Sequence, residues 1–325
     1  MLKNTAADFN KALQKWFRAH GRVLPWRSNP SPYAVLVSEF MLQQTTVVAV
    51  KPYFQRWMKR FPDVTSLASA PQEDVMKHWE GLGYYSRARN LHRAAKAILS
   101  RFGGMIPDDL DLLLALPGVG PYTASAVAAF AFDQPVPVLD ANIQRVIARL
   151  FDFHENIATA AGKKFLHQAA ASLLPEKGGH CHASALMDLG ATVCRAGQPE
   201  CTACPVRGFC QTTNPALLPV KPAKKAITQL EDWRAVSLRE GKIFLIPSPG
   251  PVWKGLWMLP PAEPCGEVIC SLTYAITRYK VNLQVFQAEP LPDWQAFSLQ
   301  NLPPMPSPHR KVIAAFLLQK KIVSP

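Results

Sequence analysis

The sequence lacks any apolar run close to the roughly 20 residues that a membrane-spanning helix requires. Its first residues, MLKNTAADFNKALQKWF, show an amphipathic helical pattern without the apolar core of a signal peptide. Neither an internal repeat nor a low-complexity tract is present. We therefore expect a cytoplasmic, globular, monomeric protein that has no association with a membrane.

Acidic residues are scarce relative to basic ones. The 325 residues include 36 Lys and Arg against 23 Asp and Glu, which gives a formal net charge of +13. An excess of this sign favours a polyanionic partner, although many basic proteins bind no nucleic acid. The length is sufficient for two domains with cores of their own.

The spacing of apolar residues changes along the chain. Helical spacing dominates residues 1–212, whereas residues 213–228 contain three prolines and a Lys pair, which predicts a linker. Residues 229–325 contain the alternating runs AVSLRE, KIFLI and VNLQVF and a closing helical stretch, which predict a small α+β domain. Helices are expected at residues 5–19, 32–60, 71–79, 86–102, 108–115, 121–132, 141–151 and 163–174.

Four of the seven cysteines lie within one short segment, residues 194–210, with the spacing C-x6-C-x2-C-x5-C. Four thiolates so close in sequence can converge on one metal centre. Zinc sites usually contain two C-x2-C pairs, and one such pair is present here, so the spacing favours a cubane iron–sulfur cluster. A zinc knuckle remains the alternative. The candidate ligands are Cys194, Cys201, Cys204 and Cys210.

A glycine-rich turn, LPGVG, precedes the helical stretch PYTASAVAAFAF. Residues 108–132 are therefore expected to form a helix-hairpin-helix. Gly118 and Gly120 allow a tight turn whose backbone N–H groups bind an anion such as a DNA phosphate. An ordinary corner between two helices is the alternative for this motif alone.

Two carboxylates occupy unusual sequence positions. Glu39 lies in the apolar stretch AVLVSEFML, in a helix that Ser31-Pro32 should begin; burial would raise its pKa and make it a general acid. A Glu on the polar side of an amphipathic helix is the commoner case. Asp140 ends PVPVLD just before a helix, where amide donors would cap it and keep it ionised. One protonated and one ionised carboxylate suit the cleavage of a glycosidic bond.

Together these motifs resemble those of the endonuclease III, or helix-hairpin-helix, superfamily of DNA glycosylases. The segments VSEFMLQQT at 37–45, GLGYYSRARNLH at 81–92 and LPWR at 24–27 resemble the MutY-type adenine glycosylases in particular. The resemblance implies a mainly α, two-lobed core with a 4Fe-4S cluster. It also implies a base-excision repair enzyme that flips and hydrolytically removes adenine mispaired with 8-oxoguanine or guanine in double-stranded DNA.

The resemblance also implies residue roles. Glu39 would protonate adenine N7 and later activate water, while Asp140 would stabilise the sugar cation. Tyr122 stands where bifunctional members carry a Schiff-base lysine, so a monofunctional glycosylase is expected. Ser184 departs from the Gln or Glu that relatives often carry near the adenine. The other implied contacts are Asn142 with water and the carboxylates, Trp26 and Arg27 beside the adenine, and Gln44 and Tyr84 as wedges in the duplex.

The C-terminal residues 229–318 resemble the Nudix-like domain of the same family. An Arg-Glu-x-x-Glu-Glu helix is missing, which argues against phosphohydrolase activity, and the family's His-x-Phe-Thr-His strand is replaced by YAITR at 274–278. The resemblance implies that Ser307 and His309 on a loop recognise 8-oxoguanine. Alternatively, Ser307 and the following proline simply begin the last helix.

Two other functions remain open at this point. A thymine-mismatch glycosylase of the same superfamily would share the tyrosine after the hairpin, but Glu39 and the second domain argue against it. A lesion-binding protein without catalytic activity would have no need of both Glu39 and Asp140.

Overall fold

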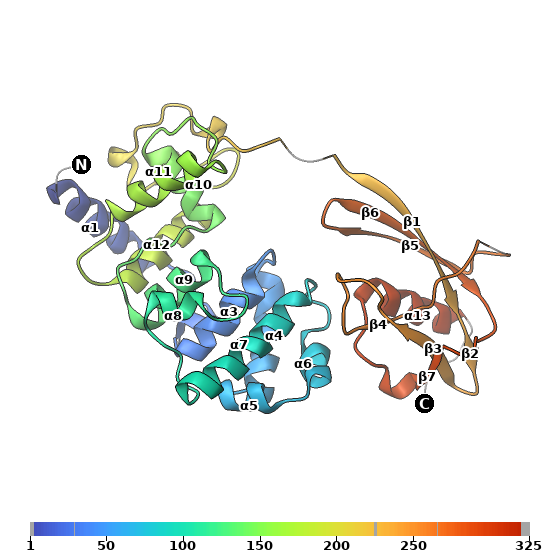
Figure 1. Cartoon of the computed structure of the whole chain (residues 1–325). Helices are drawn as coiled ribbons and strands as arrows, with labels where there is room; N and C mark the ends of the chain where they lie inside the picture. Colours follow the sequence, from blue (N-terminus) through green and yellow to red (C-terminus); the bar gives the residue numbers. More distant parts are fainter. Residues whose placement is uncertain (1–2, 29, 224–225, 265, 320–325) are drawn as a thin grey trace. The chain divides into compact units, whose positions relative to one another are not determined.

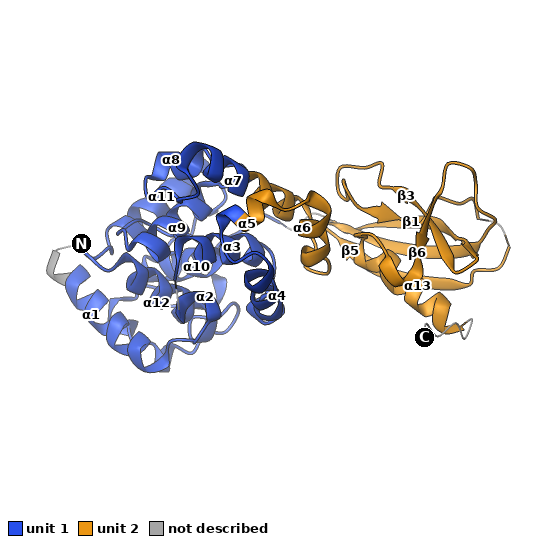
Figure 2. Ribbon diagram, turned by 90° about the horizontal axis from the view of Figure 1, so that it is seen from below, with its two compact units in different colours: residues 1–65, 94–223 blue, residues 66–93, 224–325 orange. Residues whose placement is uncertain are grey.

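A computed structural model describes residues 3–28, 30–223, 226–264 and 266–319. The chain divides into two compact units, one formed by residues 1–65 and 94–223 and the other by residues 66–93 and 224–325 (Figure 2). The second unit therefore includes a helical segment from the first third of the sequence. The domain division expected from the sequence, with a linker at 213–228, did not include residues 66–93 in the second domain. The expected domain limits stay a prediction.

The first unit is helical, and its core lies around two helices, α3 (Pro32–Leu42) and α9 (Pro121–Phe132). Both are buried on nearly all sides and pack against each other, as helices that are apolar all round do. The other helices are α1 (Lys3–His20), α2 (Pro25–Ser28), α4 (Val47–Arg60), α8 (Leu110–Leu114), α10 (Ala141–Leu150), α11 (Ala160–Ala171) and α12 (Gly179–Thr192), with α5 (Val64–Ser69) and α7 (Ser86–Phe102) crossing the unit limits.

The expected helices are present, but one of them is broken in two, and three helices, α2, α5 and α12, were not expected. The stretch expected as one helix at 32–60 is two helices, because Gln44 adopts a φ of 54° and Thr46 caps α4 by accepting from the Ala49 N–H at 3.3 Å. Helix α12 was not expected, because its apolar residues surround the helix instead of forming one stripe. The Ser31 cap is confirmed: its Oγ accepts from the Ala34 N–H at 3.2 Å.

The second unit is an α+β structure, as predicted. One sheet has the order β1-β6-β5, with β1 parallel and β5 antiparallel to β6; in the other, β3 pairs with β2, β4 and β7 (Figure 1). Helix α13 (Ser307–Gln319) packs against β5. The strands are β1 (Thr228–Val236), β2 (Leu238–Arg239), β3 (Lys242–Pro247), β4 (Trp257–Met258), β5 (Cys270–Ile276), β6 (Tyr279–Gln287) and β7 (Gln295–Ser298).

Residues 66–93 are tied to the C-terminal part by polar contacts inside the second unit. Arg310 on α13 pairs with Glu80, which follows α6 (Gln72–Trp79). The Tyr85 hydroxyl donates to the Met305 carbonyl at 3.2 Å. Within the described ranges, no helix has the length and apolar character needed to cross a membrane.

Candidate active site

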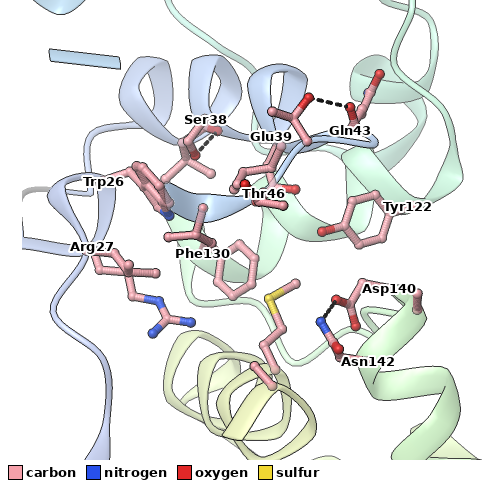
Figure 3. Close-up of a pocket in the computed structure, with 18 of the residues that line it drawn as sticks. Trp26, Arg27, Ser38, Glu39, Gln43, Thr46, Tyr122, Phe130, Asp140 and Asn142 are labelled. Atoms are coloured by element: carbon pink, nitrogen blue, oxygen red, sulfur yellow. Dashed lines mark hydrogen bonds between the residues drawn. The ribbon is translucent and has the colours of Figure 1, made fainter. Parts of the chain in front are cut away.

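A cavity of about 1000 Å³ opens in the first unit. Side chains from α2, α3, α9, α12 and the turns before α4 and α10 surround it, as Figure 3 shows. The predicted site residues among its lining are Trp26, Arg27, Glu39, Gln44, Tyr122, Asp140 and Asn142. The fold thus brings together residues that lie more than a hundred positions apart in the sequence.

Glu39 is the most deeply buried acid of the cavity, with 4% of its surface exposed. Burial raises the pKa of its carboxyl to about 7, against the opposing effects of the Tyr122 hydroxyl and Arg27. Its Oε2 atom has no hydrogen-bond partner among the described residues. The sequence-based expectation of a buried Glu with a raised pKa is confirmed.

Asp140 caps α10 as expected, since its Oδ1 accepts from the Ile143 N–H at 2.6 Å. Its Oδ2 accepts from Asn142 Nδ2 at 2.9 Å (Figure 3). Burial nevertheless raises its pKa, whereas the sequence had suggested that amide donors and the helix dipole would keep the carboxylate ionised. These donors oppose the rise, so Asp140 is the better stabilised anion of the two carboxylates.

Two arginines of α10 connect this cap to the cysteine segment. Arg145 Nη2 donates to Asn142 Oδ1 at 2.9 Å and to the Gly190 carbonyl at 2.6 Å, while its Nε donates to the Cys194 carbonyl at 2.8 Å. Arg149 is 1% exposed and donates to Cys194 Sγ at 3.3 Å. Neither arginine was predicted from the sequence, although two arginines four residues apart lie on the same face of a strongly amphipathic helix and could have indicated a shared role.

Trp26 and Arg27 lie on the short helix α2. The Trp26 ring is buried and meets Phe54 edge to face at 5.4 Å, which fixes its position in the cavity wall. Arg27 donates to both carboxylate oxygens of Asp188 on α12, at 3.0 and 3.1 Å. Asp188 was not anticipated, even though it is a lone acid in an apolar stretch, the same signal that singled out Glu39.

The α12 residues that line the cavity are His180, Met187 and Ala191. Ser184, the departure noted in the sequence, is fully buried beside them and does not line the cavity. The shape of the cavity on this side is therefore determined by the side chains of His180, Met187 and Ala191.

The predicted hairpin joins α8 to α9. Gly118 has a φ of 77°, a value that glycine adopts without strain. Gly120 is the N-cap of α9 and provides no side-chain cap, so the N–H groups of the first turn that follow Pro121 have no side-chain acceptor at the cap. A Cβ added at Gly120 would meet no atom within 4 Å, so the space above this turn is open.

The four clustered cysteines line one small cavity together with Arg149 and Arg207. None of the four takes part in a disulfide. Among the described residues, no three His, Cys, Asp or Glu side chains converge closely enough to hold a single metal ion.

In the second unit, Tyr84 and Ser307 line one cavity of about 520 Å³. Tyr84 has a φ of 46° and 42% of its surface exposed, and the Arg87 guanidinium lies 5.5 Å from its ring centre. A bulky residue with a positive φ is strained, a state found most often at functional sites.

His309 does not lie on a loop, contrary to the expectation from the resemblance. It belongs to the first turn of α13, is fully buried, and accepts from the Leu259 N–H at 3.2 Å. Its ring meets Trp253 edge to face at 5.3 Å, and burial lowers its pKa to about 3. It is a neutral core residue, because helix formation at Ser307 turns its ring inward.

Comparisons with known proteins identify the family. Residues 37–172 match the HhH-GPD superfamily of base excision DNA repair proteins. The adenine DNA glycosylase of Buchnera aphidicola subsp. Baizongia pistaciae is 34% identical over 262 residues, which are 79% of this chain and 74% of that protein. This chain belongs to the adenine DNA glycosylases of the HhH-GPD superfamily. It is therefore an N-glycosyl hydrolase of base excision repair.

Other adenine DNA glycosylases match a shorter part of the chain. The Mycolicibacterium smegmatis protein is 43% identical over 60% of this chain and 66% of its own length. The Mus musculus protein is 41% identical over 62% of this chain and 41% of its own length.

Solved structures support the fold of the helical core. A thermostable thymine-DNA glycosylase superposes with a TM-score of 0.57 and 29% identity over 64% of this chain and 96% of its own. An endonuclease III–DNA complex gives a TM-score of 0.54 at 22% identity over 65% and 96%.

Proposed function

We propose that this glycosylase excises adenine mispaired with 8-oxoguanine or guanine from double-stranded DNA, in the cavity of its helical unit. The observation that carries the proposal is the pairing in one cavity of two buried carboxyls, Glu39 and Asp140, in different surroundings. Such a pair divides acid and anion roles between its members.

Glu39 is the proton donor. With a pKa of about 7, a large share of its carboxyl is protonated at neutral pH, and the unpartnered Oε2 is free to meet a base. Protonation of adenine N7 weakens the bond between N9 and the sugar C1′. That bond breaks with its electron pair leaving on the adenine, and the sugar becomes a cation.

Asp140 stabilises that cation. Its carboxylate is oriented by Ile143 N–H and Asn142 Nδ2 and needs no rearrangement as the charge develops. Water then adds to C1′, and its proton passes to the Glu39 carboxylate, which restores the starting state. Because Tyr122 contributes a phenol where a Schiff base would need an amine, the glycosylase is monofunctional.

Contacts with the duplex are assigned to several elements. The hairpin amides near Gly118 and Gly120 would bind a phosphate. Gln44 and Tyr84, each with a positive backbone φ, are each proposed to insert into the duplex near the lesion. Trp26 and Arg27 would border the adenine itself.

The cysteines at 194–210 suit a 4Fe-4S cluster. The four thiols line one small cavity, and their C-x6-C-x2-C-x5-C spacing favours a cubane cluster over zinc, whose sites usually contain two C-x2-C pairs. Such a cluster would order the loop between α12 and the linker; iron and sulfide analysis of purified protein tests this assignment.

Residues 229–325 are proposed as the lesion-recognition domain. Since His309 is buried, Ser307 at the start of α13 is the contact to 8-oxoguanine that we retain. Ser307 lines the same cavity as Tyr84, which supports a shared role at the mispair.

The test is base release from duplexes with A, T or G opposite guanine and 8-oxoguanine. The proposal expects release of adenine from both mispairs, fastest opposite 8-oxoguanine, and retention of thymine. Release of thymine opposite guanine, or binding without release, would favour the two alternatives instead.

A further inference from the structure

Asp188 forms the densest set of ionic contacts near the cavity, although none of its side chain is exposed. Its Oδ1 accepts from Arg22 Nε at 2.9 Å, from Arg22 Nη2 at 2.6 Å and from Arg27 Nη2 at 3.1 Å. Its Oδ2 accepts from the Arg22 backbone N–H at 2.8 Å and from Arg27 Nη1 at 3.0 Å. The carboxylate is therefore held by four hydrogen bonds from two guanidinium groups and one from a backbone N–H.

The two arginines line the cavity, whereas Asp188 does not. Their side chains are 32% and 13% exposed, so Arg27 in particular is largely withdrawn from water. Without a partner, a cation so placed would carry a large desolvation cost. The negative charge of Asp188 neutralises one of the two positive charges, and its hydrogen bonds fix both guanidinium groups in one orientation.

The charge of Arg27 reaches Glu39. Arg27 favours the ionised form of Glu39, while Asp140 disfavours it and the Tyr122 hydroxyl stabilises the anion. From α12, His180 is the titratable residue in the cavity lining, and α4 adds only Val47 to that lining. Without Asp188, the positive charge of Arg27 would therefore lower the pKa of Glu39 further, because few other charges line the cavity.

We propose that Asp188 is a positioning residue of the glycosylase reaction: it holds Arg22 and Arg27 at the wall of the cavity that Glu39 also lines, and it offsets the charge of Arg27 there. The protonated form of the acid is thereby maintained next to a cation. This inference rests on the proposed role of Glu39 as proton donor.

The experiment is a single-turnover pH–rate profile for adenine release, measured on wild type and Asp188→Asn. Asparagine retains the shape and one acceptor oxygen but leaves one added positive charge near Glu39. The alkaline limb, where Glu39 loses its proton, should move to lower pH by about one unit, a tenfold loss of rate on that limb. Arg27→Gln should move the same limb to higher pH.

The double variant Asp188→Asn/Arg27→Gln restores the charge balance and should return the limb close to its wild-type position. Asp133→Asn is the matched control, because its carboxylate accepts from the backbone N–H of His180 and no hydrogen bond joins it to either arginine. Its limb should not move.

A reduced rate in Asp188→Asn with an unshifted limb would overturn the inference and leave a purely structural role. If Asp188→Asn does not fold, an unshifted limb in Arg27→Gln has the same meaning. Failure of wild type to release adenine at any pH would instead contradict the proposed function.

Discussion

Arg145 holds Asn142 in the orientation in which Asn142 contacts the cap of α10. Arg145 Nη2 donates to Asn142 Oδ1, and Asn142 Nδ2 donates to Asp140 Oδ2, each at 2.9 Å. The same guanidinium is bonded to the Cys194 carbonyl at 2.8 Å. The Arg145 side chain thus connects the cysteine segment to Asp140, the carboxylate proposed to stabilise the sugar cation.

Arg145→Lys should lower the rate of adenine release about tenfold or more, because a lysine cannot satisfy Asn142, Gly190 and Cys194 together. Single-turnover kinetics measure the loss. The Asn142→Ala variant and the double variant complete a cycle, and less-than-additive losses are expected because both act through Asp140. Strict additivity would contradict this relationship. Arg195→Gln, at a half-exposed arginine paired with Glu200, is the control.

Glu39→Gln should stabilise the folded protein above neutral pH. The pKa of Glu39 is raised from 4.5 to about 7, so wild type loses stability as pH rises between these values, and the loss is complete above the folded pKa. Glutamine carries no such cost, and the gain at pH 8 should be up to about 3 kcal/mol. Denaturant unfolding at pH 8 and at pH 4 measures it. An equal difference at both pH values would mean that ionisation of Glu39 is not its source.

Tyr122→Lys should introduce strand cleavage and borohydride trapping on adenine-mismatch DNA, because the amine would replace a hydroxyl that lies beside the reacting carboxyls. Wild type and Tyr122→Phe should trap little protein. Efficient trapping of wild type would contradict a monofunctional mechanism.

Ser307→Ala and His309→Ala should affect different properties. Ser307→Ala should slow adenine release opposite 8-oxoguanine more than opposite guanine, by the loss of about 1 kcal/mol of hydrogen bonding, with little change in melting temperature. His309→Ala should lower the melting temperature of the second unit, since the ring is fully buried against Trp253. If instead His309→Ala reduced the preference for 8-oxoguanine and Ser307→Ala lowered only the melting temperature, the proposed contact of Ser307 with the lesion would be contradicted.

The site could be predicted where local sequence determines the environment. Glu39 was identified because an acid within an apolar helix is buried with it, and Asp140 because an aspartate just before a helix is a favoured N-cap. The cysteine spacing and the glycine turn are local in the same sense.

What could not be predicted depends on how segments pack. The break near Gln44 lies inside one continuous apolar pattern, and α12 has no distinct polar face to reveal it. The contact between Arg145 and Gly190 joins residues 45 positions apart, and the contact between Arg27 and Asp188 joins residues more than 160 positions apart. His309 faces inward because α13 begins at Ser307, a boundary that fixes the direction of every side chain after it.

The most direct test compares adenine release by wild type, Glu39→Gln and Asp140→Asn under single-turnover conditions, with binding to the same A·8-oxoguanine duplex measured in parallel. Glutamine cannot donate the proton and asparagine cannot stabilise the cation. The account predicts that both variants bind the duplex with near wild-type affinity and release adenine at least about a thousandfold more slowly. Near wild-type release by either variant would contradict it.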